Sequence, residues 1–121
     1  MREIKFRAWF KKQKKISNSF RLELMTDFMQ GLILQNDVEI MQYTGLKDKN
    51  GVEIYEGDIV KIIDESEIEE HTSEIKWDGG AFMVKFPIDE YEYITIGSAV
   101  GNDLIIEIIG NIYENPELLT P

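Results

Sequence analysis

Hydrophobic and polar residues alternate at the start of the chain. Ile4, Phe6, Ala8 and Phe10 fall on one face of an extended segment, and the opposite face carries basic side chains. This period of two predicts a half-buried strand over residues 2–10. The sequence KKQKKISNS that follows has no periodicity and predicts a loop, and the alternation in FRLELM, residues 20–25, predicts a return strand.

Turn residues divide much of the remaining chain into short apolar segments. Asn50-Gly51 is the strongest reversal signal, because both residues tolerate a positive φ. The sequence GDIVKIID, which follows shortly after it, predicts a buried strand. Residues 72–86 predict a hairpin that turns at the sequence DGG, and the isoleucine-rich LIIEIIGNIYEN, residues 104–115, predicts a central strand.

Other segments leave alternatives open. Residues 26–31 predict either a turn or one helical turn, and GLILQNDVEIMQY, residues 31–43, predicts one strand or two strands broken at Asn36-Asp37. ESEIEEH, residues 65–71, predicts an acidic loop because it has little to bury. Residues 87–103 mix turn residues with a short apolar stretch.

Strands at intervals of about ten residues, separated by turns, predict a mainly β fold, either an antiparallel sandwich or a small barrel. A length of 121 residues without an internal repeat or a long linker predicts a single domain. The hydrophobic content of 43% lies in the globular range, so we expect the chain to fold.

Composition argues against several classes of function. The sequence has no run of about 18 uncharged apolar residues, and its N-terminus lacks the apolar stretch of a secretory signal, so we expect a cytoplasmic protein. Cysteine is absent and there is one histidine, which excludes disulfides, a cysteine nucleophile and a cysteine or histidine zinc cluster. The sequence indicates no cofactor and no small-molecule substrate.

Charge is divided unevenly along the chain, whose formal net charge is −10. Residues 1–21 hold eight basic side chains and one acidic side chain, and residues 22–121 hold the other five basic and 22 acidic ones. Such asymmetry indicates a basic segment that meets an anionic partner, or one that neutralises acidic surface on its own chain or on another copy. The strongly acidic remainder favours the second interpretation over nucleic acid.

Four sequence blocks resemble one known family. They are KFRAW at residues 5–9, MQYTGLKDKNGVEIYEGDIV at 41–60, the spacing W..G.F from Trp77 to Phe82, and IIGNIYENPELL at 108–119. In this order they are similar to the YopX-like family of small phage and prophage proteins. The resemblance implies a mainly β fold with a small SH3-like barrel and no established biochemical activity. We expect one domain over residues 1–121, with a basic hairpin segment over 1–37 and a barrel region with a C-terminal segment over 38–121.

The polar residues of the block at 41–60 could serve catalysis or metal binding, or they could only shape the backbone. Glu53, Glu56 and Asp58 are close enough in sequence for acid–base work or magnesium binding, but strand alternation separates Glu53 from the other two. We favour a turn in which Asp58 accepts backbone N–H groups and Gly57 supplies an unusual backbone angle. The residues of a candidate interaction patch are Tyr43, Lys47, Tyr55, Glu56, Asp58 and Trp77.

The acidic run from Asp64 to Glu70, followed by His71, is a weak candidate for a cation site. It lacks the glycine that a calcium loop uses for its tight turn, so we expect a solvated loop. His71 alone supplies neither a catalytic triad nor a metal cluster.

Nucleic-acid binding has two candidate features. Six aromatic residues could form a stacking platform, but most of their neighbours are acidic, so we expect core packing: Trp9, Tyr43, Tyr55, Trp77, Phe82 and Tyr113. Four lysines form a patch suited to phosphate but lack interleaved aromatic residues: Lys11, Lys12, Lys14 and Lys15. No phosphate-binding glycine loop is present.

The sequence therefore predicts a non-enzymatic phage or prophage accessory protein, a protein-interaction or self-assembling module. In this interpretation its basic hairpin meets acidic surface on another copy or on a host protein. Two alternatives remain: a small nucleic-acid-binding barrel that uses the lysine loop, and an acidic protein that mimics DNA to inhibit a host protein.

Overall fold

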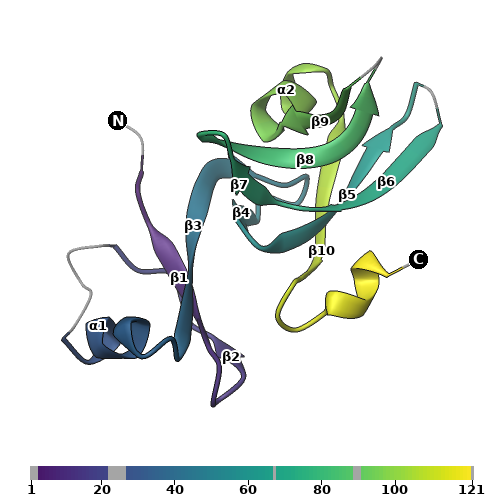
Figure 1. Ribbon diagram of the computed structural model, residues 1–121. Coiled ribbons are helices and arrows are strands. Elements are labelled where there is room, and N and C mark those ends of the chain that lie inside the picture. The colour runs from purple at the N-terminus through teal and green to yellow at the C-terminus, as the bar shows by residue number, and fades with distance from the viewer. Residues whose placement is uncertain (1–2, 22–26, 67, 89–90, 121) are drawn as a thin grey trace.

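The computed structural model describes residues 3–21, 27–66, 68–88 and 91–120. Antiparallel strands dominate the fold, which confirms the predicted mainly β class (Figure 1). In chain order the elements are β1 Phe6–Phe10, β2 Lys15–Ile16, α1 Asp27–Leu34, β3 Val38–Lys47, β4 Glu53–Tyr55, β5 Asp58–Asp64, β6 Glu69–Glu74, β7 Lys76–Asp78, β8 Ala81–Ile88, β9 Tyr91–Thr95, α2 Ile96–Gly101, β10 Ile105–Asn111 and the 3-10 helix η2 Pro116–Leu119.

The N-terminal sheet has the strand order β2-β1-β3-β4. β1 lies antiparallel to the first half of β3, with Ala8 opposite Ile40, and β4 lies along the opposite edge of the second half, with Tyr43 opposite Tyr55. Ala8 is fully buried, in agreement with the apolar face predicted for this strand. β3 begins at Val38 and joins β1 and β2 to the rest of the molecule (Figure 1).

Two three-stranded antiparallel sheets, with the orders β10-β5-β6 and β7-β8-β9, curl around the main core as a half-barrel. β5 is fully buried over much of its length, as its β-branched run predicts. The SH3-like detail implied by the resemblance stays a prediction. The core residues are Ile54, Val60, Ile62, Ile75, Val84, Phe86, Ile96, Ala99, Leu104 and Ile106.

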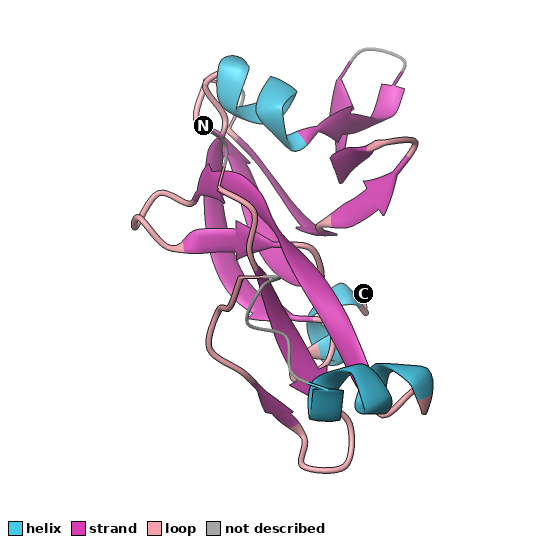
Figure 2. Ribbon diagram, turned by 90° about the vertical axis from the view of Figure 1, so that its left-hand side faces the viewer, coloured by secondary structure: helices cyan, strands magenta, loops and turns pink. Residues whose placement is uncertain are grey.

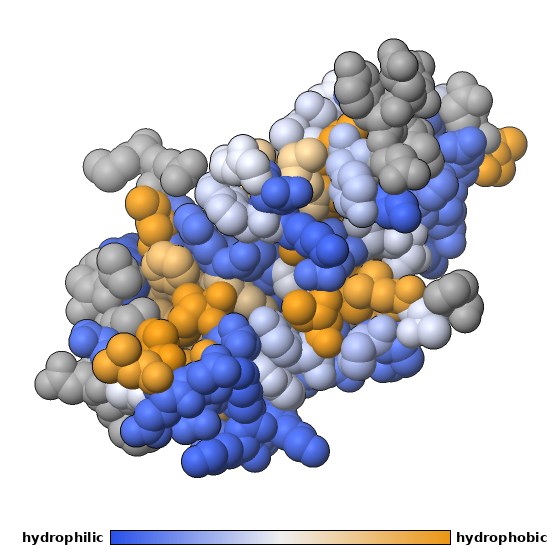
Figure 3. Space-filling view, in the orientation of Figure 1, coloured by the Kyte–Doolittle hydropathy of each residue, from blue (hydrophilic) through white to orange (hydrophobic). Residues whose placement is uncertain are grey.

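Short helices lie at the two ends of the molecule. Figure 2 shows α2 at the end formed by the half-barrel and α1 at the opposite end. The side chain of Thr95 caps α2 by accepting a hydrogen bond of 3.0 Å from the Ser98 amide, while Ile96 and Ala99 enter the core. Apolar surface is visible on the face of the molecule in Figure 3, and the exposed apolar side chains include Ile33 and Leu34 of α1 and Leu118 and Leu119 of η2.

The strand that returns beside β1 differs from the prediction. It is β2, Lys15–Ile16, within the segment predicted as a loop, because Lys14 adopts a φ of 55° and reverses the chain directly after β1. Phe20 forms an isolated bridge with Phe6, and residues 22–25 of the predicted strand lie outside the described residues.

Three further segments differ from their predicted form. β10 is a strand as predicted but lies at the edge of its sheet, because β5 pairs with neighbours on both sides. The second part of the acidic segment is β6, which pairs with β5 while its glutamates remain in solvent. Residues 31–34 belong to α1 and not to a strand, and the chain reverses after α1 through a φ of 59° at Asn36.

The turn predictions agree with the structure. The reversal at Asn50-Gly51 lies between β3 and β4, with a φ of 80° at Gly51. The sequence DGG, residues 78–80, turns β7 into β8 as predicted, with Trp77 opposite Phe82. Both turns use glycine at a positive φ, which glycine adopts without steric cost, and this explains why their signals agree with the structure.

Candidate functional site

The block at residues 41–60 packs as alternating layers of aromatic and basic side chains. The rings of Tyr43 and Tyr55 lie 5.5 Å apart across the paired strands. The Lys5 ammonium lies 5.1 Å from the centre of the Tyr43 ring, and the Arg7 guanidinium lies 4.7 Å from that of Tyr55. Cations over aromatic faces are stabilising, so β1 is held to β3 and β4 through this stack.

Arg7 and Asp58 form an ion pair between the two parts of the molecule. One carboxylate oxygen of Asp58 accepts from Arg7 Nη2, and the other accepts a 2.8 Å hydrogen bond from the Tyr55 amide. Asp58 is 1% exposed. Burial raises the pKa of Asp58, against the opposing effect of the Arg7 charge and the hydrogen bonds. The pair fixes the entry of β5 relative to β1.

Gly57 is the junction between these parts. Its φ is 85°, as predicted for an unusual backbone angle, and its amide donates to the Ile75 carbonyl at 2.9 Å. Its carbonyl accepts from the Ile112 amide at 2.8 Å, and a methyl group on its Cα would lie 3.3 Å from Met41 Sδ. The end of β4, the β6–β7 connection and the segment after β10 therefore meet at one residue without a side chain.

Asp48 is a second organising carboxylate, which the sequence reasoning missed. Its Oδ1 accepts from the amides of Asn50 at 2.9 Å and Val52 at 3.0 Å, and its Oδ2 accepts from the Ile108 amide at 3.0 Å. Burial acts to raise its pKa, but these hydrogen bonds outweigh burial and the pKa is lowered. An aspartate two residues before Asn50-Gly51 is the sequence signal that could have found it, since Asp commonly bonds to the amide two residues on.

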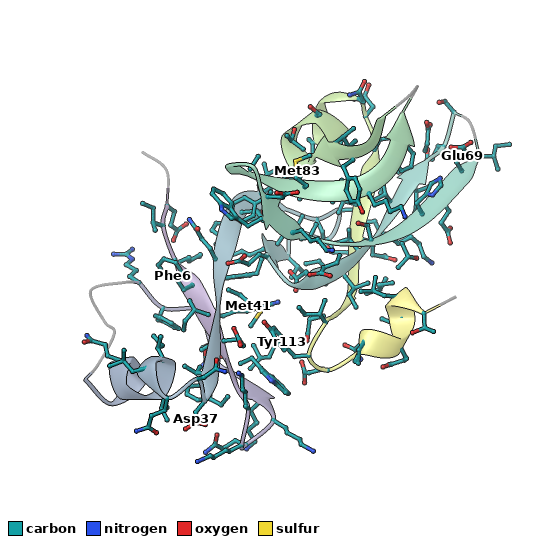
Figure 4. The ribbon with its side chains drawn as sticks, viewed as in Figure 1. Phe6, Asp37, Met41, Glu69, Met83 and Tyr113 are labelled. Atoms are coloured by element: carbon teal, nitrogen blue, oxygen red, sulfur yellow. The ribbon has the colours of Figure 1, made fainter. Side chains whose placement is uncertain are left out.

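An open groove of about 310 Å³ lies between the N-terminal sheet, the half-barrel and the segment after β10. Met41 and Tyr113 both border it and lie side by side in Figure 4. We call it the acidic groove, and its lining residues are Glu39, Ile40, Met41, Glu56, Gly57, Glu74, Ile75, Lys76, Trp77, Ile112 and Tyr113.

Three carboxylates converge on the acidic groove. Glu39 comes from β3, Glu56 from the β4–β5 turn and Glu74 from β6. Burial raises the pKa of Tyr113, and the negative charges of these three glutamates raise it further. All three carboxylates thus act on the Tyr113 phenol, and in the groove lining they outnumber the single lysine, Lys76, so the groove favours cations.

Aromatic side chains form part of the groove wall. Trp77 is 54% exposed and packs edge-on against Phe82, with 4.8 Å between ring centres. Tyr113 stacks against Trp9 at 5.5 Å. An indole face beside carboxylates is a chemical combination that suits a guanidinium or ammonium group.

The structure does not bring the six residues of the candidate patch onto one surface. Tyr43, Tyr55 and Asp58 are buried, because the first two form the ring stack and the third pairs with Arg7. The two tyrosines are buried, as the expected core packing of the aromatic residues requires. Trp77 and Glu56 both line the acidic groove, whereas Lys47 borders a separate hollow beside β10.

The predicted hydrogen bond from a backbone amide to the Asp58 carboxylate is confirmed. The donor is Tyr55, three residues earlier, and not a residue that follows Asp58. The long-range partner Arg7 lies 51 positions away, so no local turn rule could identify it.

Lys11, Lys12, Lys14 and Lys15 lie where β1 turns into β2, and we call this segment the basic turn. Two of its four lysines are paired within the chain. Lys11 Nζ lies 3.0 Å from a carboxylate oxygen of Glu39, and Lys12 Nζ lies 3.7 Å from one of Asp37. Lys14 and Lys15 are exposed. The basic turn therefore lies next to the acidic groove, with Glu39 shared between them.

The acidic run and His71 form the β5–β6 hairpin. The His71 ring packs edge-on against Phe86 at 4.8 Å, and His71 Nε2 lies 3.7 Å from a carboxylate oxygen of Glu69. Within the described ranges no group of three or more histidine, aspartate or glutamate side chains could hold a metal ion. In the same ranges no helix is long and apolar enough to cross a membrane.

Comparison with known families identifies the chain's relatives. The family model described as YopX protein matches residues 5–120. The chain belongs to the YopX family. No curated protein is similar enough to match it.

Two solved structures share the YopX family fold over nearly their whole length. Protein EF1440 from Enterococcus faecalis is 27% identical, with a TM-score of 0.60, and the match covers 97% of this chain and 98% of that one. Protein yopX from Bacillus subtilis is 20% identical, with a TM-score of 0.62, and the match covers 95% and 97%. The family assignment implied by the sequence blocks is therefore confirmed.

Proposed function

We propose that this YopX family protein is a non-enzymatic protein-interaction module that binds a basic polypeptide in the acidic groove. The observation that carries the proposal is the convergence of Glu39, Glu56 and Glu74 beside the exposed indole of Trp77. Charge of one sign in a concave surface attracts the opposite charge and orients its approach. The phage or prophage setting implied by the resemblance is part of the same proposal.

The other carboxylates of the signature block support an interaction role over catalysis. Glu53 pairs with Lys5, and Asp58 pairs with Arg7, so each already neutralises a cation that holds β1 in place. A general acid or base needs a proton that it can exchange with a bound substrate. Because Glu53 and Asp58 both form ion pairs within the chain, they support the sequence-based interpretation that this block forms a turn and not a catalytic or magnesium site.

A basic polypeptide fits the observations better than nucleic acid does. Tyr43 and Tyr55 are buried, so they offer no stacking surface, and two lysines of the basic turn are already paired. A basic DNA-binding protein would present a suitable segment. The DNA-mimicking inhibitor considered from the sequence is therefore one form of this proposal.

The test is a fluorescence anisotropy titration with a labelled nine-residue peptide that carries arginine at alternate positions. We expect binding at about 50 mM salt that weakens as salt screens the charges. Glu56→Gln/Glu74→Gln should weaken it about tenfold, since partly desolvated charge pairs contribute on that order. The carboxamide oxygen that replaces the carboxylate at position 56 can still accept the Gln42 amide hydrogen bond that Glu56 now accepts.

The matched control is Glu65→Gln/Glu69→Gln, which removes the same number of charges from the exposed β5–β6 hairpin. It should bind the peptide like the unmodified protein. Equal losses in both double variants would contradict a localised site, and the same peptide with glutamate in place of arginine should not bind.

Self-association is a second candidate, favoured by the position of the basic turn beside the acidic groove. The turn of one copy could enter the groove of another, and the exchange would be reciprocal. Sedimentation velocity at tens of micromolar should then show a dimer at low salt that dissociates at high salt and on Lys14→Gln/Lys15→Gln. A monomer under both salt conditions argues against this candidate.

A further inference from the structure

β1 covers one edge of β3 along its first half, and the opposite edge of that half has no neighbouring strand in the described ranges. β1 pairs with β3 from Val38 to Gln42, and β4 pairs with the opposite edge only from Tyr43 to Lys47. Among the strands of the described ranges, none pairs with that opposite edge before Tyr43. Unpaired strand edges are templates for the addition of another strand.

The strand register determines which main-chain groups face the open edge. Tyr43 donates its amide to the Lys5 carbonyl at 2.9 Å, and Lys11 donates to the Asp37 carbonyl at 3.0 Å, so the odd-numbered positions of β3 bond to β1. In an antiparallel pair the intervening residues point their N–H and C=O groups the other way. Ile40 therefore directs both groups toward the open edge.

At Gln42 a neighbouring segment satisfies the main-chain N–H and C=O groups on this edge. Its amide donates to Glu56 Oε1 at 2.9 Å, and its carbonyl accepts from the Glu56 amide at 3.0 Å. Ile40 is the next position that faces this way, and it lines the acidic groove. Its side chain lies on the sheet face of Ala8, its directly opposed partner, so Ile40 borders the groove through its main chain.

We propose that an extended basic segment of a separate protein adds to β3 at Ile40 as a further strand, with a lysine or arginine side chain among the three glutamates of the acidic groove. This inference rests on the proposed function and specifies its binding mode. Main-chain hydrogen bonds would supply affinity, and the pocket beside the added strand would select the side chain.

Charge complementarity favours a separate basic protein over a second copy as the occupant. The chain carries a formal net charge of −10, and Glu39 stands next to the open position, so two copies that pair here bring like charges together. Charged residues along an edge are a common protection against pairing between identical chains. A basic segment meets no such repulsion.

The first test measures amide hydrogen exchange by NMR. In the free protein the Ile40 amide should exchange quickly, and the Met41 amide, which faces β1 opposite Arg7, should be protected. Addition of the arginine peptide should slow exchange at Ile40 by at least about tenfold. Strong protection of Ile40 without peptide, at every protein concentration, would overturn the open edge. Protection that disappears on dilution would identify a second copy as the occupant and overturn the choice of a separate protein.

The second test compares two isomers of the arginine peptide that are N-methylated at alternate amides. An added strand uses every second amide toward its neighbour, so one isomer should bind about tenfold more weakly and the other should bind like the parent. Equal binding by both isomers and the parent would overturn strand addition and leave groove binding intact. If the parent peptide itself does not bind, the proposed function fails as well.

Discussion

Asp48 and Asp58 are both buried aspartates, but their surroundings shift their pKa values in opposite directions. Asp58 has one cation and one amide donor to offset its burial, and its pKa is raised. Asp48 accepts three amide hydrogen bonds, and its pKa is lowered. Asp58 is the more deeply buried of the two, so burial outweighs its two partners, whereas at Asp48 the three amide donors, which stabilise the charged form, outweigh burial.

Asp48→Asn should lower the free energy of unfolding at neutral pH by about 1–3 kcal/mol, because a carboxamide has one acceptor oxygen and leaves an amide donor unpaired. A group whose native pKa is lowered stabilises the fold above its unfolded pKa and loses that contribution as pH falls through the native pKa. The difference between the two proteins should therefore shrink below about pH 4. Urea unfolding across pH measures this, and a difference that grows on acidification would contradict it.

Arg7→Met should cost about 3–5 kcal/mol at neutral pH, because it leaves the buried Asp58 carboxylate without its cation. A raised native pKa gives stability that is present below the unfolded pKa and is lost as pH rises through the native value. The variant should therefore lose stability as pH rises from about 4.

A double variant isolates the uncompensated charge in this experiment. Arg7→Met/Asp58→Asn keeps an acceptor for the Tyr55 amide and removes the charge, so it should recover much of the loss in urea unfolding. No recovery would show that Arg7 acts through its packing on the Tyr55 ring and not through the ion pair.

Individual residues of the site were predictable where the signal is local. Glycine at position 57 indicates a positive φ, and an aspartate beside it indicates an amide acceptor. The Arg7 partner of Asp58 and the convergence of the three groove glutamates depend on segments far apart in the sequence. Such contacts follow from the tertiary arrangement, which no local pattern encodes.

At the scale of elements, the β4–β5 turn joins the N-terminal sheet to the half-barrel. Gly57 and Gly51 have similar positive φ values of 85° and 80°, but their surroundings differ. A side chain at Gly57 would meet Met41 at 3.3 Å, whereas one at Gly51 would meet nothing within 4 Å.

Both alanine variants incur the cost of a left-handed conformation, about 1 kcal/mol each. Gly57→Ala should lose about a further 1 kcal/mol because it must displace buried side chains. Thermal unfolding of the two variants in parallel compares them directly, with Gly51→Ala as the control. Equal losses would mean that the contact with Met41 relaxes without cost.

Turn residues made the hairpins predictable from the sequence, whereas the order of the strands within each sheet was not predictable. The isoleucines of β10 indicate burial, but burial comes from the core side of the strand as readily as from a central position. β2 is two residues long and α2 six, so neither holds enough residues for a periodic signal. Neither element therefore leaves a pattern that can be recognised in the sequence.

At the scale of the whole molecule, opposite charges lie side by side. Lys11 of the basic turn pairs with Glu39 at the rim of the acidic groove, so part of the bipolar charge is neutralised inside the chain. The groove keeps Glu56 and Glu74 beside Trp77. This arrangement, together with the open strand edge inferred at Ile40, is the basis for the proposed basic polypeptide partner.

NMR titration with the arginine peptide tests that central claim most directly. The chain has two tryptophans, so the indole N–H signals of Trp77 and Trp9 can be assigned with one variant. We predict that the peptide shifts the Trp77 indole together with the amides of Glu56 and Glu74 and leaves the exposed Glu65, Glu69 and Glu70 of the β5–β6 hairpin unchanged. Saturating shifts confined to that hairpin or to the basic turn, with the Trp77 indole signal unchanged, would contradict binding in the acidic groove.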